Sequence, residues 1–264
     1  CALPISLVVL KDMMDKKYLK LFEEITSAIS QTVIDKKIGI AFSGGVDSTL
    51  IAKICKEMNY DIVLLTIGFA QSHDILFAQE VNEQLNYSHH ILEIDSKDFP
   101  SIPTMINEKI KTDNLSWNEN CIAFYYVSKL AKSLGISTVI TANGIDELFC
   151  GYNAYRDAFL GGESKIIEVM DAKLDNELKM MKAVNMIASE FGVSILQPLL
   201  SKDFIDYAKN VPITEKITDS EDLYRKHMIR KLARQVNVPE VSYNKRKKAL
   251  QYGSKIHKTL LKTR

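Results

Sequence analysis

The sequence predicts an α/β fold, in which a parallel, twisted β-sheet carries helices on both faces and a helical layer follows towards the C-terminus. Three observations lead to this prediction. Short apolar runs alternate with segments whose apolar residues recur every three or four positions, which is typical of β-α-β units. A pair of glycines directly follows the first apolar run, as expected where a strand turns into a helix. The second half of the chain has helical spacing almost throughout.

The elements of the first half follow from these two periodicities in chain order. Residues 1–10 are expected to form a strand or an extended tail. Apolar residues at helical spacing predict helices over residues 12–35, 49–58, 74–85 and 121–134. Continuous apolar runs predict buried strands over residues 38–42, 61–68, 90–94 and 137–141. Ser43, Ile67 and Thr141 would then lie at the carboxyl edge of a parallel sheet, where ligands bind in such folds.

The later part of the chain changes character after Gly151. Residues 163–191, 201–210 and 220–236 predict further helices, with breaks at Pro198, Pro212 and Pro239. We therefore divide the chain into an N-terminal segment with a helix (residues 1–36), a core (residues 37–160) and a helical region that completes the same domain (residues 161–264).

Composition narrows the class of protein. The 264 residues are 46% hydrophobic and 25% charged, which is ordinary for a globular chain with a sizeable core. A net charge of +1 argues against a dedicated nucleic-acid-binding protein. The apolar residues 2–10 are too short to span a membrane and lack the basic start of a signal peptide. The four cysteines form no C-x-x-C pair, so we expect a soluble cytoplasmic protein with free thiols.

Charge is nevertheless uneven along the chain. From Arg225 onward, Glu240 is the only carboxylate among many lysines and arginines. Three interpretations stay open: a solvated helical surface, a basic wall over an anionic nucleotide, or a contact with RNA.

The first motif, residues 43–48, reads Ser-Gly-Gly-Val-Asp-Ser between a predicted strand and a predicted helix. The free N–H groups at a helix N-terminus and the positive end of its dipole make this an anion site. The common P-loop carries a lysine before its final Ser/Thr, whereas this chain has Asp47 there. An acid beside a phosphate site is physically reasonable where a divalent cation bridges the two.

The second motif, residues 141–152, follows the fourth predicted strand and contains Gly144, Asp146 and Glu147. The two carboxylates would face Asp47 across the sheet, and carboxylates with phosphate oxygens are a normal arrangement for Mg²⁺. The alternative is that both acids are N-caps of the next helix.

The two motifs carry a resemblance to a known family. Residues 43–48 resemble the pyrophosphate loop of the PP-loop ATP-pyrophosphatase superfamily, an adenine nucleotide α-hydrolase-like fold. Residues 141–152 are similar to the Gly-x-Gly-x-Asp-Glu-x-Phe-Gly-Gly-Tyr motif of the synthase domain of asparagine synthetase. Residues 197–200, the Arg225-Lys226 and Arg230-Lys231 pairs, and residues 246–249 also resemble that domain. The likeness extends from about residue 12 to residue 253.

The resemblance implies a role for each matching residue. Pyrophosphate would be held by Ser43, Gly44, Gly45, Asp47 and Ser48. Mg²⁺ would be bound by Asp47 and Asp146. The rest of the nucleotide site would be formed by Ala41, Ile67, Asp74, Thr141 and Ala142. Lys248, with Lys247 as the competing candidate, would reach the reacting α-phosphate, where a cation offsets the charge that builds up on phosphorus.

Three departures from the family pattern fall in the part that would bind the acceptor. Asn143 stands where asparagine synthetases usually carry a glutamate that manages protons as ammonia attacks, and an amide cannot act as a general base. Cys150 replaces the first glycine of Gly-Gly-Tyr, and residues 118–123 lack the family's Ser-x-Pro. We list Asn143 with Lys248 as the candidate catalytic residues.

The resemblance implies a ligase that uses ATP and Mg²⁺. A substrate carboxylate, with aspartate favoured, would attack the α-phosphate, pyrophosphate would leave, and ammonia would convert the acyl-adenylate to an amide. We expect no glutaminase domain in this chain, so ammonia would come from solution or from a separate glutaminase subunit, and a homodimer is left open. The alternatives are a cyclase of the β-lactam synthetase type, a tRNA-modifying adenylating enzyme, and an ATP-binding protein without catalysis.

Overall fold

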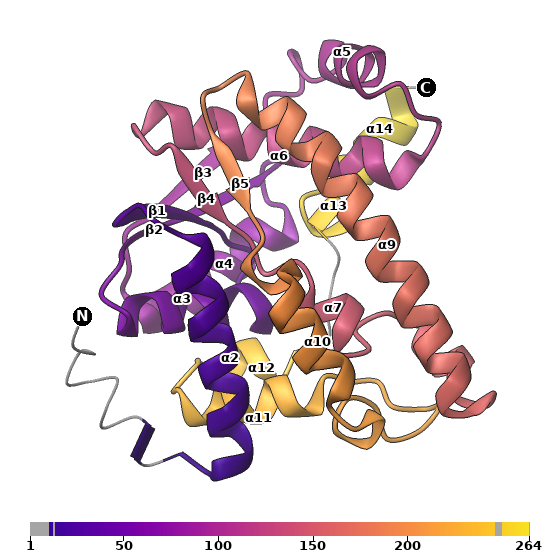
Figure 1. Ribbon diagram of the computed structural model, residues 1–264. Coiled ribbons are helices and arrows are strands. Elements are labelled where there is room, and N and C mark those ends of the chain that lie inside the picture. Colours follow the sequence, from indigo (N-terminus) through magenta and orange to yellow (C-terminus); the bar gives the residue numbers. More distant parts are fainter. Residues whose placement is uncertain (1–10, 13, 246–249, 264) are drawn as a thin grey trace.

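A parallel five-stranded sheet forms the centre of the computed structural model, which describes residues 11–12, 14–245 and 250–263. The strands are β1 (Lys37–Ala41), β2 (Asp61–Gly68), β3 (His89–Glu93), β4 (Thr138–Ile140) and β5 (Ser194–Leu196). Their order is β3-β2-β1-β4-β5, and every neighbouring pair is parallel. The predicted fold class is therefore confirmed (Figure 1).

Helices connect the strands and form the layers around them. Those of the first half are α2 (Lys16–Thr32), α3 (Val46–Glu57), α4 (His73–Leu85), α5 (Ser101–Ile110), α6 (Leu115–Ser133), α7 (Ile145–Leu148) and α8 (Ala154–Phe159). Those of the second half are α9 (Gly162–Ser189), α10 (Lys202–Asn210), α11 (His227–Gln235), α12 (Glu240–Tyr243), α13 (Leu250–Gly253) and α14 (Ile256–Thr263), with short 3₁₀ turns at Pro198–Leu200 and Ile213–Glu215.

The strands bury side chains on both faces, so the protein has two cores. In β2, Ile62 and Leu64 point into one core with α2, α3 and α11, while Val63, Leu65 and Ile67 point into the other with α5, α6, α9 and α14. This alternation is the period of two that a strand imposes on its side chains. Burial on both faces explains why β2 is a continuous apolar run rather than an alternating one.

The order of the strands indicates where a ligand is expected, at the carboxyl ends of β1 and β4. Because β1 lies between β2 and β4, the connections leaving β1 and β4 diverge there, and parallel sheets bind ligands at such a point. The long helix α9 runs along one side of the molecule in Figure 1, and it contacts β5, α6, α7 and α8. One helix thus joins the sheet to the segment after β4.

Several predicted boundaries of helices and strands were wrong. Helix α3 begins at Val46 rather than at residue 49, so Asp47 and Ser48 lie in its first turn. Helix α6 begins at Leu115 instead of residue 121, and α5 and the three-residue β5 were not predicted. The predicted strand or tail at residues 1–10 lies outside the described residues.

The predicted helix over residues 220–236 was also wrong in its first part, because α11 begins only at His227. The Asp222 carboxylate accepts hydrogen bonds from the backbone N–H groups of Thr218, Tyr224 and Arg225. Such side-chain acceptors give the backbone an alternative to a helix. Within the described part of the chain, no helix is long and apolar enough to cross a membrane.

A buried lysine gives a test of this packing. Lys216 is fully buried, donates to the Ala208 carbonyl oxygen at 2.7 Å, and lies 5.6 Å from the centre of the Phe149 ring. Burial lowers its pKa to about 8. Because the unfolded chain binds the proton more tightly, stability should rise as the pH increases from about 8 towards about 10.4.

We expect the Lys216→Met substitution to raise the free energy of unfolding at neutral pH by about 1–3 kcal/mol, since a buried charge is replaced by an apolar group. It should also remove the rise in stability above about pH 8. Urea denaturation of the variant and of wild type, at neutral pH and above pH 8, measures both effects. Lys202→Met, at an exposed position, is the control. A large loss of stability in Lys216→Met would show that the hydrogen bond to Ala208 outweighs the cost of burial.

Candidate active site

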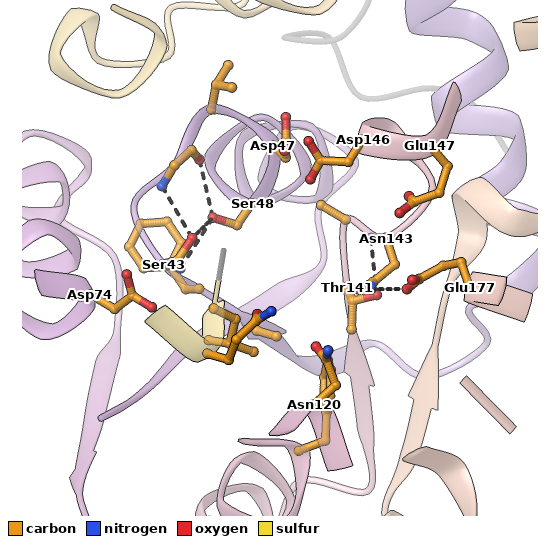
Figure 2. A pocket seen from close by; sticks show the side chains of 18 of the residues that line it. Ser43, Asp47, Ser48, Asp74, Asn120, Thr141, Asn143, Asp146, Glu147 and Glu177 are labelled. Atoms are coloured by element: carbon orange, nitrogen blue, oxygen red, sulfur yellow. Dashed lines mark hydrogen bonds between the residues drawn. The ribbon is translucent and has the colours of Figure 1, made fainter. Parts of the chain in front are cut away.

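A cavity of about 270 Å³ opens at the carboxyl edge of the sheet. It is lined by most of the residues predicted from the sequence, and their proposed roles stay predictions: Ala41, Ser43, Gly45, Asp47, Ser48, Ile67, Asp74, Thr141, Ala142, Asn143 and Asp146. Gly44 belongs to the same loop without being part of the lining. Lys247 and Lys248 lie outside the described residues. Figure 2 shows how the labelled side chains converge on this cavity.

The loop between β1 and α3 is shaped by its own hydrogen bonds. Gly44 has φ +74°, and a Cβ at this position would lie 2.9 Å from the Phe77 carbonyl oxygen of α4, so glycine is required for two reasons. The Ser43 N–H donates to Ser48 Oγ at 3.3 Å, and that hydroxyl donates to the Gly45 carbonyl oxygen at 3.2 Å. The N-terminus of the twelve-residue helix α3 therefore opens into the cavity with a fixed geometry.

The helical half of the chain supports this loop from outside. The Ser242 hydroxyl of α12 lies 2.7 Å from the Gly44 carbonyl oxygen and 3.1 Å from Thr49 Oγ1. Both contacts are buried. The loop conformation thus depends on a residue almost two hundred positions later in the chain.

Lys226 joins the two acidic motifs. Its ammonium group lies 2.9 and 2.7 Å from the two carboxylate oxygens of Asp47 and 3.1 Å from Asp146 Oδ1. The residue is only 1% exposed. In Figure 2, Asp47 and Asp146 point towards one another from α3 and α7. Two carboxylates from the ends of neighbouring strands therefore share one cationic partner.

This arrangement fits a divalent cation. The carboxylates already converge on one positive charge, and Mg²⁺ is commonly held by one or two carboxylates together with substrate phosphates and water. Among the described residues, no group of three or more His, Cys, Asp and Glu side chains could hold a metal alone, so the other ligands would come from phosphate and water. Asp47 and Asp146 would hold the metal only after the Lys226 ammonium had moved aside.

Glu147 has a different position from its neighbour Asp146. Its Oε2 accepts from the Gly144 N–H at 2.9 Å and its Oε1 accepts from the Tyr152 hydroxyl. It thus caps α7 from the third position of the helix, whose N-cap is Gly144, so the alternative that both acids are N-caps is wrong for Asp146. Burial, followed by the charges of nearby carboxylates, raises the pKa of Tyr152 well above its usual value, so this phenol stays protonated.

Polar groups from α6 and α9 form the opposite end of the cavity. Asn143 Nδ2 donates to Glu177 Oε1 at 2.5 Å, as the dashed line in Figure 2 marks. The neighbouring Asn176 accepts from the Trp117 indole N–H at 2.9 Å. Lys173, one turn earlier on α9, lies 5.1 Å from the centre of the Tyr152 ring. This end therefore offers amide, carboxylate and ammonium groups to a polar substrate.

The sequence predicted only part of this site. Glu177 and the position of Lys226 were missed. Lys226 belonged to a basic segment for which three interpretations stayed open, and nothing in the sequence distinguished Glu177 from other helical acids. Of the three departures from the family pattern, Asn143 and Asn120 line the cavity, but Cys150 does not. Cys150 is fully buried with φ +59°, a conformation that glycine adopts at no steric cost.

Comparison with known proteins identifies relatives of this chain. The family model described as asparagine synthase matches residues 20–186 and 177–263. The chain is 24% identical over 217 residues to a putative asparagine synthetase (glutamine-hydrolyzing) of Methanocaldococcus jannaschii, covering 78% of this chain and 39% of the relative. An asparagine synthetase (glutamine-hydrolyzing) of Arabidopsis thaliana is 26% identical over 216 residues, with 78% and 37% covered.

The chain therefore spans less than two fifths of the length of these two relatives. Among solved structures, an NMN synthetase from Francisella tularensis is similar with a TM-score of 0.47 and 16% sequence identity, covering 90% of this chain and 76% of that one.

Whether a metal can bind to the two carboxylates that Lys226 contacts can be tested without measuring enzymatic activity. In Lys226→Met, the two carboxylates would lose the ammonium group that they share, and we expect the free energy of unfolding in chelator to fall by about 2 kcal/mol or more. Millimolar Mg²⁺ should recover much of this loss by binding both carboxylates. Thermal melts with and without Mg²⁺ measure the effect. The matched control is Lys226→Met with Asp146→Asn, and an equal Mg²⁺ response in both variants would contradict the shared site.

Proposed function

The chain belongs to the asparagine synthase family, and on this premise we propose that it is an ATP-dependent ligase that activates a carboxylate and converts it to an amide. The family supports the general class of ATP-dependent ligases. The finer assignment, in which aspartate is the acceptor, ammonia the nucleophile and asparagine the product, is favoured by the names of the relatives.

One observation supports the proposal most strongly. A single cavity has the loop at the N-terminus of α3 and the paired carboxylates at one side, and an amide and a carboxylate at the other. A reaction that joins a nucleotide phosphate to an oxygen of a substrate carboxylate, and then an amine to the carbon of that carboxylate, needs these two chemistries within one cavity.

The groups around the loop have roles that follow from their positions. The N–H groups of the loop and the start of α3 would bind the pyrophosphate portion of ATP. Lys226, Arg230 and Lys245 also line the cavity, and their charge would stabilise the anion that leaves. A Mg²⁺ ion held by Asp47 and Asp146 would, when bound, neutralise negative charge on the departing pyrophosphate. Lys248 remains our candidate for contact with the α-phosphate.

The nucleophile is the least constrained part of the proposal. The two relatives described above are named as glutamine-hydrolyzing. We propose ammonia, either free in solution or released by a glutaminase, and we keep an amine of the substrate itself as the second candidate. The observation that favours this second candidate is Asn143, because the acceptor end of the cavity departs there from the family pattern.

The decisive assay measures pyrophosphate release from ATP and Mg²⁺ with ammonium, comparing aspartate with a panel of other carboxylic acids and a blank without acid. Aspartate-dependent release with AMP and asparagine as products would support the full proposal. Release with another acid alone would keep the mechanism and replace the substrate. ATP binding without pyrophosphate release for any acid would contradict the proposal and favour a non-catalytic protein.

Substitutions of the paired carboxylates test the nucleotide half of the mechanism. Asp47→Ala and Asp146→Ala should each lower Mg²⁺-dependent turnover by about 10²-fold or more, since each removes a group that positions charge around the pyrophosphate. Far-UV circular dichroism should stay native. Asp157→Ala, at an exposed position on α8, serves as the control and should retain full activity. Activity close to wild type in either cavity variant would show that the metal assignment is wrong.

A further inference from the structure

The amide-forming step releases a proton from the attacking nitrogen, and some group in the cavity must accept it. Ammonia that attacks an acyl carbon becomes positively charged and must lose a proton, and Asn143 has no basic site for it. The carboxylate nearest to this amide belongs to Glu177, whose Oε1 lies 2.5 Å from Asn143 Nδ2. Glu177 lines the same cavity and is 5% exposed.

The contact also orients Asn143. An ionised carboxylate only accepts hydrogen bonds, so the amide must present its NH₂ group to Glu177 and turn its oxygen away. The Asn143 backbone is held in addition by its N–H, which lies 3.3 Å from Thr141 Oγ1. Asn143 therefore pairs with Glu177 as a positioning residue, and its oxygen can accept an N–H of the incoming nucleophile.

Glu177 is rigidly placed on its helix. Within α9, Met180, Met181 and Val184 follow it along the chain and pack in the core beneath β4 and β5. The preceding residue, Asn176, is held by the Trp117 indole. A buried carboxylate on a packed helix is pre-organised to a degree that a loop residue is not.

The other acids on this side of the cavity have different partners. Asp47 and Asp146 contact the Lys226 ammonium. Glu147 accepts from the Gly144 N–H and from the Tyr152 hydroxyl. Among these carboxylates, Glu177 is the one in contact with Asn143.

We propose that Glu177 is the general base of the amide-forming step, an assignment that rests on the proposed function above. The nitrogen lone pair forms the new C–N bond, the bond from the acyl carbon to the phosphate oxygen breaks, and its electron pair leaves with AMP. One proton passes from nitrogen to a carboxylate oxygen of Glu177 and then to solvent. In this chain the carboxylate thus comes from α9, whereas the resembling family carries it at the position of Asn143.

The proposal is tested by separating the two half-reactions in the Glu177→Gln variant. Exchange of labelled pyrophosphate into ATP, with aspartate or whichever acid proves active, reports formation of the acyl-adenylate and should stay close to wild type. Amide formation from ammonium should fall by about 10²-fold or more, and its rate, divided by the fraction of ammonium present as free ammonia, should lose the limb that rises with pH. The nitrogen that hydroxylamine places on the acyl carbon is more acidic than that of ammonia and loses its proton more readily, so hydroxamate formation should fall much less.

A second variant makes the test independent of any loss of packing. Asn143→Glu combined with Glu177→Gln places a carboxylate at position 143. The rate of amide formation should then be at least about tenfold higher than in Glu177→Gln alone. Asp175→Asn, at an exposed site on the same helix, is the control and should match wild type. Unchanged amide formation in Glu177→Gln, or no recovery in the double variant, would overturn the role of Glu177.

The two proposals fail in different ways. Wild-type protein that shows no pyrophosphate exchange with any acid would overturn the proposed function and this assignment together. Normal exchange in both wild type and Glu177→Gln, with equal rates of amide formation, would leave the ligase intact and overturn only the assignment of the base. A parallel loss of exchange and amide formation in Glu177→Gln would show that Glu177 is structural.

Discussion

The contact of Lys226 with Asp47 and Asp146 is the interaction on which the site depends. It joins the segments that follow β1 and β4, two neighbouring strands whose connections diverge. The contact therefore fixes the positions of the two segments on either side of the cavity. The lysine reaches this position through two successive left-handed residues, with φ 43° at Arg225 and 53° at Lys226. Each left-handed residue costs about 1–2 kcal/mol. The hydrogen bonds from backbone N–H groups to Asp222, and from Arg225 to the Gly151 carbonyl oxygen, offset that cost.

The fold and the side of the cavity formed by residues 43–48 were predictable because their determinants are local. A strand, a glycine turn and a helix start are contiguous in residues 38–50, and the same holds for residues 138–148. Parallel pairing then brings the two strand ends to one edge without further information. Even so, α3 begins earlier than its apolar periodicity indicates. The periodicity missed the first turn because Asp47 and Ser48, which lie there, are polar.

The remaining contacts of the cavity were not predictable in the same way, since they join residues that are distant in sequence. Asn143 and Glu177 are separated by 34 positions, and Lys226 meets Asp47 across 179. Periodicity can place Glu177 on a helix, but it cannot say which partner its side chain will meet. The start of α11 depended on a single side chain, Asp222, competing for backbone N–H groups. The role of Lys248 stays a prediction.

Helix α9 has a consequence for how such a protein can diversify. Lys173, Asn176, Glu177 and Met180 all reach the cavity from one stripe of this helix, while Met181, Val184 and Ile187 are buried in the core. The groups that would meet an acceptor are therefore borne on a surface physically distinct from the loop that would grip the nucleotide. Substitutions in that stripe, at intervals of three and four residues, could therefore change the acceptor while the loop at residues 43–48 stays the same.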